Sequence, residues 1–433
     1  MTDPNPRPVI LIGYSAAVLA YLSRFLPERS MIFVDEPDVL RKRNVHAATA
    51  GAVSLREVIE WEYLRDGAAD CFFHRYRDLD PAAVVPIIEY GVPFAARLAE
   101  RYGAVGAGYG AALALRDKRL QRAITAAAGL PNPRSVPVTG PEQVQAFLAE
   151  VGGPVVLKPA NRQAALGTRI LREPAEVPAA WQECLQQDEG VLVPDRPMPL
   201  RMLAEQFISG QEFSVEMMVQ HGRSRFGAVT RKFLFPGPRP VEQGHLHPAD
   251  IDPELTRRLL ADTGRVIDAF GMDCGFVHCE WMVDGGVPYF IECAGRMAGD
   301  GIIELVDMTW DYDVVGEFYA MMQGRPLGDP PPPAASRYAA TWTSLAPSVG
   351  EIESVDGLSA AHAVPGVRTV VAHDAGEPAH PLRSSQDRVT LVTAAGDTPA
   401  EALANAQRAV DLIEFKVRPA PVGPAPVAPA PAG

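Results

Sequence analysis

The sequence predicts an α/β protein built from several domains. Short apolar runs that end at glycine or proline alternate with helical stretches along most of the chain. A length of 433 residues exceeds what one compact core accommodates, so two to four domains are expected. With 47% hydrophobic and 21% charged residues, the composition is that of a globular protein.

Composition also excludes several classes of function. The net charge is −13 and no basic run occurs, which argues against sequence-independent nucleic-acid binding. No apolar run approaches the roughly 20 residues of a membrane helix, and the polar N-terminus has no signal-peptide core. The five cysteines form no C-x-x-C pair, so neither a disulfide framework nor a zinc site is indicated. We expect a cytoplasmic protein.

The N-terminal region reads as the start of a βαβ unit. Residues 9–13 form an apolar run that ends at a glycine turn, a helical stretch covers 16–25, and a second strand covers 31–34. The turn holds the single glycine Gly13 instead of G-x-G-x-x-G, so a dinucleotide site is a weak alternative to a plain scaffold domain. Helical periodicity is expected over 84–102, and a short strand with a glycine-rich loop over 104–110.

A second α/β region follows. A helix is expected over 120–128, where Gly129 and two prolines end it. The strand 155–158 stops at Pro159 and leads into a loop of small residues, 160–168. Residues 204–219 give two segments hinged at a Ser-Gly pair.

The last part of the chain reads mainly as strands. Runs over 275–281 and 288–292 flank Asp284-Gly285-Gly286, which is a hairpin signal. After a proline linker at 330–333, short strands precede a helix over 399–413, and the Pro/Ala tail from 418 is expected to be disordered. We therefore predict five segments, with boundaries after residues 112, 203, 330 and 417.

Two glutamates in the predicted hairpin are the first candidate site residues. Glu280 and Glu292 lie in apolar strands on either side of a tight turn, which brings both carboxylates to one sheet face. A divalent cation would remove their repulsion, and Mg²⁺ is typically held by one or two carboxylates plus substrate phosphates. Arg296 follows in a glycine-containing turn, within reach of a phosphate. The alternative is a structural Glu292–Arg296 salt bridge with Glu280 at a sheet edge.

Lysine is rare in this chain, which makes its positions informative. Only five of the 40 basic residues are lysines. Lys118 opens a helix, and Lys158 ends an apolar strand beside the small-residue loop, which suggests that the loop amides and the lysine bind an anion. Each lysine taken alone is at least as well explained as a surface residue with a buried stem.

The order of these features resembles the ATP-grasp superfamily of carboxylate–amine ligases. Asp117-Lys118, the stop after Gly129, the strand ending at Lys158, the segment 204–212 and the two glutamates occur in the order typical of that family. The resemblance covers about 115–324. It implies a multidomain ATP-grasp fold with an N-terminal Rossmann-like, pre-ATP-grasp α/β domain and a small C-terminal α+β domain.

The resemblance also implies an ATP site. By analogy, two lysines contact the phosphates, the loop 161–168 closes over them, a hinge segment reads adenine through its main chain, and a glutamate takes the ribose hydroxyls. A further phosphate contact is expected from a third lysine. The residues in these roles are Lys118 and Lys158 for the phosphates, Gly167 in the loop, Glu205, Gln206, Phe207 and Ile208 in the hinge, Glu212 for the ribose, and Lys232 as the third lysine.

The metal and catalytic groups follow by the same resemblance. Glu280 and Glu292 match the carboxylates that bind two Mg²⁺ ions, which Mn²⁺ can replace, and Arg296 matches the arginine that steadies the transferred phosphoryl group. The usual Glu-x-Asn motif is Glu292-Cys293-Ala294 here, which resembles the L-amino-acid (dipeptide) ligase branch. In that branch a Glu-x-x-His pair, here Glu242 and His245, lies beside the first amino-acid substrate; a surface turn is the alternative.

Three more residues are assigned to the substrate pocket: His278, Gly299 and Asp300. In the best-known dipeptide ligase a bulky aromatic residue stands at the position of Asp300. We therefore expect a roomier or more polar pocket here, suited to a cationic or hydrogen-bonding group. By contrast, Cys279 and Cys293 should point to the opposite sheet face and pack in the core.

These assignments lead to a functional hypothesis. We expect ATP-dependent formation of an amide from a carboxylate and an amine, both of them amino acids, through an acyl phosphate. The alternatives are a ligase that uses a non-amino-acid carboxylate or a carrier-bound amine in specialised metabolism, and an inactive ATP-binding regulator. The expected partners are small molecules, and we expect neither nucleic acid nor a membrane to bind. The sequence does not decide between a monomer and a homodimer.

Overall fold

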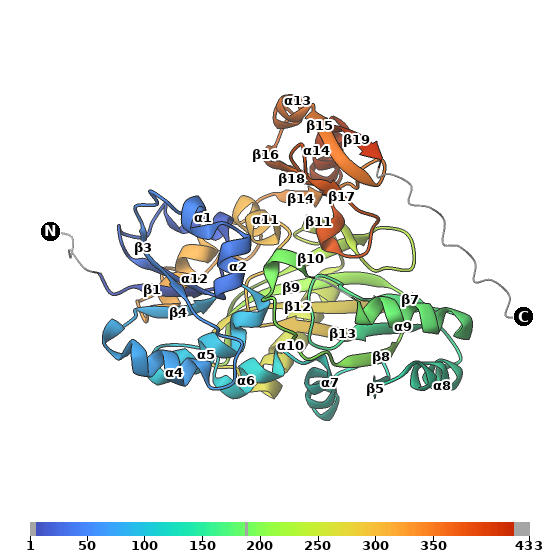
Figure 1. The fold of residues 1–433 in the computed structure, drawn as a ribbon, viewed down its shortest axis with the longest axis horizontal. Coiled ribbons are helices and arrows are strands. Elements are labelled where there is room, and N and C mark those ends of the chain that lie inside the picture. Colours follow the sequence, from blue (N-terminus) through green and yellow to red (C-terminus); the bar gives the residue numbers. More distant parts are fainter. Residues whose placement is uncertain (1–5, 187–188, 420–433) are drawn as a thin grey trace, which may run out of the picture.

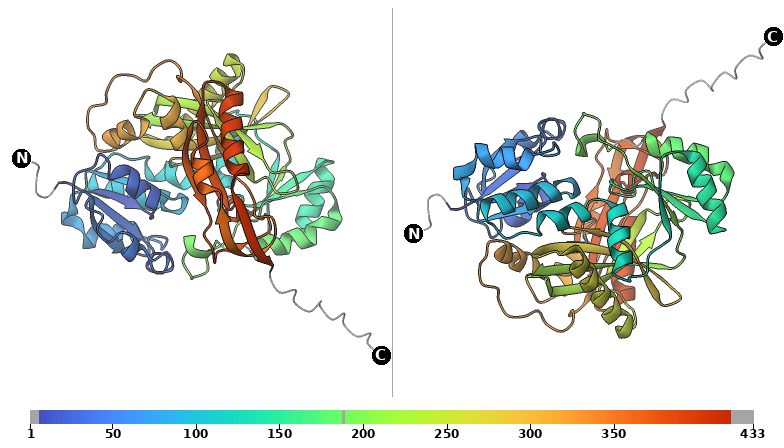
Figure 2. Two further views of the ribbon diagram at one scale, coloured as in Figure 1. Left: turned by 90° about the horizontal axis from the view of Figure 1, so that it is seen from above. Right: turned by 90° about the horizontal axis from the view of Figure 1, so that it is seen from below.

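The computed structural model describes residues 6–186 and 189–419. Three parts surround a central β-sheet (Figure 1): an N-terminal α/β unit on one side, a small antiparallel sheet on the opposite side, and a C-terminal unit that extends the central sheet. Figure 2 shows the same arrangement from above and below. Within the described ranges no helix is both long and apolar enough to cross a membrane.

The N-terminal unit is a parallel sheet in the order β3-β2-β1-β4, which confirms the predicted βαβ start. Its strands are almost fully buried because helices cover both faces. The strands are β1 (Val9–Ile12), β2 (Met31–Asp35), β3 (Leu55–Glu60) and β4 (Ala83–Pro86). The helices are α1 (Ala16–Leu22), α2 (Pro37–Lys42), α3 (Val45–Ala48), α4 (Ala68–Arg75) and α5 (Val92–Tyr102), with 3₁₀ turns η1 (Arg77–Leu79) and η2 (Glu89–Gly91).

Gly13 has a steric reason to be glycine. It sits directly after β1 with φ of 91°, a conformation that L side chains rarely adopt. A Cβ there would lie 2.4 Å from the side chain of Ile88, which follows β4. The glycine therefore allows the ends of β1 and β4 to come together beneath the first helix.

Two predictions in this region were wrong. The helical stretch expected over 84–102 is a strand followed by a helix, because Val84 and Val85 pair beside β1 and Pro86 ends that run before α5 begins. Residues 104–110, all in the described part of the chain, form no strand. Instead, a loop leads into the helix α6 (Tyr109–Ala114).

The small sheet has the antiparallel order β5-β8-β6-β7. The helix α7 (Lys118–Ala127) precedes it, and the side chain of Asp117 caps that helix by accepting from the amide of Arg119. The strands are β5 (Ser135–Val138), β6 (Val155–Pro159), β7 (Arg169–Leu171) and β8 (Met202–Gln206). The other helices are α8 (Pro141–Val151) and α9 (Val177–Leu185), with turns η3 (Pro174–Glu176) and η4 (Gly190–Leu192).

The central sheet has eight strands in the order β13-β12-β9-β10-β11-β14-β18-β16. The predicted hairpin is confirmed as β12 (Gly275–Asp284) and β13 (Val287–Ala294), and the two segments of 204–219 are the strands β8 and β9. The remaining elements of this part are β9 (Gln211–Gln220), β10 (Arg223–Leu234), β11 (Glu242–His247), α10 (Pro253–Phe270), α11 (Ile302–Thr309) and α12 (Val314–Met322).

The C-terminal unit shares the central sheet, because β14 pairs with β11. Gly244 of β11 makes this contact close, since a Cβ there would lie 2.3 Å from the ring of Trp342. The strands are β14 (Tyr338–Trp342), β16 (Val367–Ala372) and β18 (Thr390–Gly396), with a separate sheet of β15 (Gly350–Asp356), β17 (Pro378–Ala379) and β19 (Glu414–Pro419). The helices are α13 (Leu358–His362) and α14 (Pro399–Asp411), which confirms the predicted last helix, and the turn η5 (Ser385–Asp387).

The expected segment boundaries agree only partly with these elements. The boundary after residue 112 falls inside α6, and that after 203 falls inside β8, which belongs to the small sheet. The expected disordered tail begins too early, because Arg418 and Pro419 complete β19 against β15. The rest of that tail, 420–433, lies outside the described residues.

Residues 190–196, which precede β8 of the small sheet, contact the N-terminal unit. Lys42 donates to the carbonyl oxygens of Gly190 and Val193 and pairs with Asp195 at 2.9 Å. Arg196 forms two 2.7 Å bonds with the buried carboxylate of Glu36. Lys42, for which the sequence suggests no role, therefore holds these two units together on one side of the site.

Candidate active site

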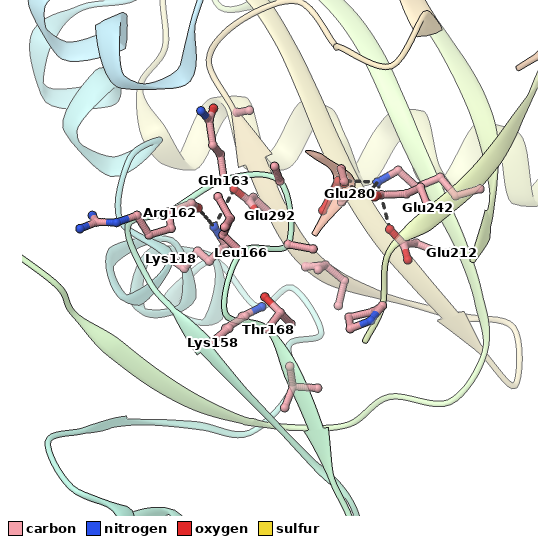
Figure 3. A pocket seen from close by; sticks show the side chains of 18 of the residues that line it. Lys118, Lys158, Arg162, Gln163, Leu166, Thr168, Glu212, Glu242, Glu280 and Glu292 are labelled. Atoms are coloured by element: carbon pink, nitrogen blue, oxygen red, sulfur yellow. Dashed lines mark hydrogen bonds and ion pairs between the residues drawn. The ribbon is translucent and has the colours of Figure 1, made fainter. Parts of the chain in front are cut away.

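The predicted site residues surround one cavity of about 270 Å³ between the small sheet and the central sheet (Figure 3). Every one of them lines it except Gly167. The lining residues are Lys118, Lys158, Glu205, Gln206, Phe207, Ile208, Glu212, Lys232, Glu242, His245, His278, Glu280, Glu292, Arg296, Gly299 and Asp300. They come from segments that lie up to 182 residues apart, so the fold gathers them.

The small-residue loop covers one side of this cavity. Gly167 is buried within the loop, and its carbonyl oxygen accepts a hydrogen bond from the Cys184 thiol. Ala164 and Ala165 have φ values of 57° and 55°, which is strained backbone for alanine. The amide of Ser385, in the C-terminal unit, donates to the carbonyl oxygen of Ala164. The loop therefore rests against the C-terminal unit.

The hinge segment leaves one main-chain donor available. The amide of Gln206 donates to the carbonyl of Arg134, and the amide of Phe207 donates to that of Pro154. Within the described residues the amide of Ile208 has no hydrogen-bond partner. An adenine ring read by the main chain would therefore use this amide.

Both predicted phosphate-binding lysines have their ammonium groups at the cavity. Lys118 opens α7, and its Nζ lies 2.9 Å from the Glu292 carboxylate. Lys158 ends β6 and pairs with Glu205, which also accepts from Arg122 at 2.7 Å. Burial raises the pKa of Glu205, but Arg122 and Lys158 outweigh it and lower that pKa to about 2.

The two predicted metal-binding carboxylates face each other across the hairpin. Glu280 of β12 pairs in register with Glu292 of β13, and both line the cavity. The neighbouring pair in the same register, Cys279 and Cys293, is fully buried on the opposite face, which confirms the predicted core role. Two carboxylates exposed to one cavity are donors that suit Mg²⁺. Glu292 pairs with Lys118, so the alternative Glu292–Arg296 salt bridge is not the arrangement found.

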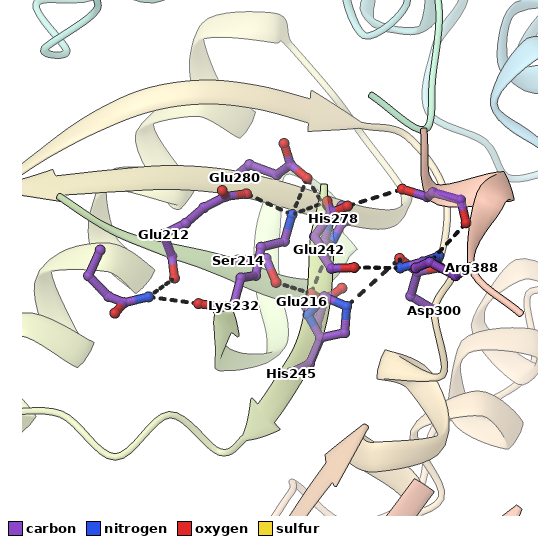
Figure 4. Close-up of polar contacts among 12 residues, drawn as sticks. Glu212, Ser214, Glu216, Lys232, Glu242, His245, His278, Glu280, Asp300 and Arg388 are labelled. Atoms are coloured by element: carbon purple, nitrogen blue, oxygen red, sulfur yellow. Dashed lines mark hydrogen bonds and ion pairs between the residues drawn. The ribbon is translucent and has the colours of Figure 1, made fainter. Parts of the chain in front are cut away.

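Lys232 occupies the centre of an acidic cluster (Figure 4). Its side chain is 1% exposed, and its ammonium group contacts three carboxylates: Glu212 at 3.0 Å, Glu242 at 3.2 Å, and Glu280. Burial lowers the pKa of Lys232, but these three carboxylates outweigh it and hold that pKa well above its usual value. Burial raises the pKa of Glu212 to about 7. The three carboxylates lie close enough to hold a cation, and the ammonium group takes that place.

His278 extends the same network. Its Nδ1 lies 2.9 Å from Glu216 and its Nε2 lies 3.2 Å from Glu280. Burial lowers the pKa of the imidazole, but Glu216 outweighs it, and the pKa rises to about 10. A charged imidazolium therefore stabilises the ionised form of Glu280, whose pKa is held well below its usual value.

The Glu-x-x-His pair lies on a strand and not on the surface turn that was the alternative. Glu242 and His245 belong to β11, and His245 is 1% exposed. Its Nε2 lies 3.8 Å from Asp300, and within the described residues neither ring nitrogen has a hydrogen-bond partner. A buried imidazole without partners at a cavity is available to a substrate.

The negative charge of Asp300 is compensated within the protein, which favours the hydrogen-bonding group over the cationic group among the two expected for this pocket. Arg388 of the C-terminal unit forms two bonds with its carboxylate, at 2.6 and 3.1 Å, and donates to the carbonyl of Glu242. Ser385 donates to the Glu242 side chain. Because Arg388 compensates its charge, Asp300 can accept hydrogen bonds from a substrate but is a weak partner for a positive charge.

Arg296 is positioned from the N-terminal unit. Its Nε lies 3.0 Å from Glu89, which also pairs with Arg116 at 2.9 Å. Sequence reasoning missed Glu89, Ser385 and Arg388, although the first two line the cavity. The one sequence signal for Glu89 is its position as a charged residue after a buried strand. No local sequence signal indicates that Ser385 and Arg388 belong to the site.

Comparisons with known proteins agree with this architecture. Residues 151–304 match the ATP-grasp domain family, and residues 343–418 match the L-amino acid ligase C-terminal domain 2. The crystal structure of an L-amino acid ligase from Bacillus licheniformis superimposes with a TM-score of 0.78 at 18% identity, covering 96% of this chain and 100% of that one.

Sequence relatives have higher identity over a smaller part of the chain. An uncharacterized protein, y4rH, of Sinorhizobium fredii is 29% identical over 304 residues, which are 70% of this chain and 61% of the relative. The alanine–anticapsin ligase of Bacillus subtilis is 25% identical over 233 residues, 51% of this chain and 49% of that enzyme. The match thus spans about half to three-fifths of the length of these relatives.

The fold and the family matches define the class of protein. Residues 151–304 form an ATP-grasp domain, and residues 343–418 match the C-terminal domain 2 of L-amino acid ligases. The chain as a whole has the fold of an L-amino acid ligase of known structure.

Proposed function

We propose that this protein is an ATP-dependent ligase that joins the carboxylate of an amino acid to an amine. The reaction passes through an acyl phosphate and yields an amide, ADP and phosphate. One observation carries the proposal: Lys118, Lys158, Glu280, Glu292 and Arg296 converge on a single cavity. Those groups are a cationic set for phosphates beside a carboxylate set for a divalent cation.

One orientation of ATP follows from these groups. The adenine ring would lie at the hinge beside the amide of Ile208, and the phosphates would lie beside Lys118 and Lys158, toward the hairpin. The loop that carries Gly167 then covers the β- and γ-phosphates through its backbone amides. Glu212 is less available to bind the ribose hydroxyls, because its carboxylate already contacts Lys232.

Glu280 and Glu292 would hold Mg²⁺, with Mn²⁺ as a substitute. When bound, the ions supply charge neutralisation on the phosphates during transfer. Lys232 and His278 both contact one oxygen of Glu280, Oε1, which would leave the other oxygen to bind an ion. Lys118 lies beside Glu292 and would lie against the same phosphates.

The amino-acid carboxylate attacks the γ-phosphate in line, and ADP departs. Arg296 stabilises the charge that develops on the phosphoryl oxygens. His245 and Glu242 would orient the amino acid, because the buried His245 ring makes no hydrogen bond within the described residues and can bond the polar groups of the substrate. The closed loop keeps water from the acyl phosphate.

A matrix of acids and amines tests the proposal. Purified protein with ATP and Mg²⁺ is screened for phosphate release against pairs of amino acids and amines, and positives are analysed by mass spectrometry. We expect release that requires both an acid and an amine, with a product whose mass is their sum minus water. Failure of every pair, with ATP bound, would favour an inactive ATP-binding regulator.

A further inference from the structure

A second and larger cavity lies next to the candidate active site, between the N-terminal unit and the central sheet. Its volume is about 850 Å³, and we call it the interdomain cavity. Its walls come from α1, the end of β4, the start of β12, the turn after β13, and the helices α11 and α12. Of the predicted site residues, only Arg296, Gly299 and Asp300 line this space.

The two cavities are continuous at the reaction centre. Gln163, Arg296, Gly299 and Asp300 line both of them. By contrast, the lysines, the hinge and the Glu242–His245 pair line only the smaller cavity. ATP and the amino-acid carboxylate therefore fill the smaller cavity, and the interdomain cavity is the open side from which a second substrate reaches the activated carbon.

The walls of the interdomain cavity are mainly apolar. Val18, Ile303, Phe318 and Met322 are among the side chains that face it. A cavity of 850 Å³ with such walls is at the upper end of the size range of small-molecule sites. A nucleophile as small as glycine would leave most of it unfilled.

Three charged groups of this cavity, Arg368, Asp307 and Glu304, compensate one another. Arg368 pairs with Asp307 at 2.6 Å and with Glu304 at 3.4 Å. The hydroxyl of Tyr21 donates to Asp307, and Arg43 donates to a main-chain carbonyl. Arg24 and Arg43 also line the cavity and lie against the rings of Tyr21 and Tyr14. Because the carboxylates Asp307 and Glu304 are paired, the apolar walls supply most of the contact that distinguishes one occupant from another.

We propose that the interdomain cavity binds the amine substrate and selects amines with a large apolar group, aromatic or branched. This inference rests on the proposed ligase function. The amine nitrogen attacks the carbonyl carbon of the acyl phosphate, a C–N bond forms and the C–O bond to phosphate breaks. The proton released by the nitrogen leaves with the phosphate.

A matched pair of substitutions on α1 tests the cavity. Ala17 is exposed and lines the cavity, whereas its exposed neighbour Ala16 does not. Ala17→Trp narrows the cavity, and Ala16→Trp controls for the added side chain. Neither Ala16 nor Ala17 is among the residues assigned to bind ATP, the metal ion or the amino-acid carboxylate.

The assay separates activation of the acid from use of the amine. Hydroxylamine traps an acyl phosphate as a hydroxamate and needs no large cavity. For the wild type we expect kcat/KM with phenylalanine as the amine to exceed that with glycine by at least about tenfold. Ala17→Trp should lower kcat/KM for phenylalanine at least about tenfold while hydroxamate formation changes less than about twofold. Ala16→Trp should match the wild type.

The possible failures are distinguishable. Hydroxamate formation with no preference for apolar amines, or an Ala17→Trp variant that keeps the wild-type preference, would overturn the cavity assignment alone. Absence of both hydroxamate and ADP with every acid would overturn the proposed ligase function, and the cavity assignment with it.

Discussion

Arg388 and Asp300 form a two-bond ion pair that joins the C-terminal unit to the candidate active site. The bonds measure 2.6 and 3.1 Å, and the Arg388 side chain is 9% exposed (Figure 4). Burial raises the pKa of Asp300, but Arg388 and His245 outweigh it and hold that pKa well below its usual value. The two residues lie 88 positions apart in the sequence, so the pair couples substrate pocket and C-terminal unit.

Removal of Arg388 should destabilise the protein. Arg388→Met leaves the Asp300 carboxylate largely buried without its partner, which typically costs roughly 3–5 kcal/mol. Urea unfolding measures this loss. In the double variant Arg388→Met/Asp300→Asn most of the loss should be recovered, and an equally unstable double variant would show that the ion pair is not the cause.

The same substitution should change the selection of the acid. With Arg388 absent, Asp300 offers an uncompensated negative charge to the pocket. The ratio of kcat/KM for a cationic amino acid to that for a neutral one should rise at least about tenfold in Arg388→Met. Arg388→Lys should keep the wild-type ratio, because it keeps the charge. A ratio that is equal in all three proteins would contradict the assignment of Asp300 to the substrate pocket.

Lys232 should be essential for assembly of the acidic cluster. Lys232→Met leaves Glu212, Glu242 and Glu280 without their shared cation, and repulsion among them should destabilise the fold by several kcal/mol, on the order of the cost of breaking a buried ion pair. Thermal unfolding measures the effect. A saturating divalent cation should recover part of the loss, since it can take the place of the ammonium group. Lys416→Met, on the β19 strand outside the site, is the matched control and should behave as wild type.

His247 gives the fold a defined dependence on pH. Its Nδ1 bonds to the Thr230 hydroxyl and its Nε2 accepts from the indole of Trp310, which requires a neutral ring. Burial lowers its pKa from 6.5 to about 4. Between these values the unfolded chain binds more protons, so stability is full above pH 6.5 and falls as the pH drops toward 4, by up to about 3 kcal/mol.

Chemical unfolding between pH 4 and 7 measures this dependence. Because other groups also titrate there, the informative quantity is the difference in slope between the wild type and His247→Gln. We expect a shallower decline in His247→Gln. Equal slopes would show that His247 does not contribute.

The sequence predicts the parts of the site that depend on local pattern. The two-glycine turn predicts the hairpin that carries Glu280 and Glu292, but their pairing also depends on a bulge between Glu280 and Trp281, without which Glu280 would oppose Ile291. Lys118 and Lys158 were marked by their places at the start of a helix and the end of a strand. These signals lie within a few residues of the side chains concerned.

Contacts between distant segments were not predictable in this way. Arg388 and Ser385 reach the site only because β14 and β18 continue the central sheet beyond β11. The burial of Lys232 likewise depends on four strands, β9, β10, β11 and β12, that lie together only in the folded sheet. The strand β4 was mistaken for helix because Val84 and Val85 precede a true helical pattern, and their pairing with β1 is not visible locally.

The stoichiometry of a single reaction tests the central claim most directly. With one productive acid–amine pair, amide, ADP and phosphate are quantified in the wild type, in Glu292→Gln and in Glu254→Gln, an exposed glutamate on α10 that serves as control. We predict equal amounts of the three products in the wild type and in the control, and a loss of at least about 100-fold in Glu292→Gln. ATP hydrolysis without amide, or a Glu292→Gln variant as active as the control, would contradict the account.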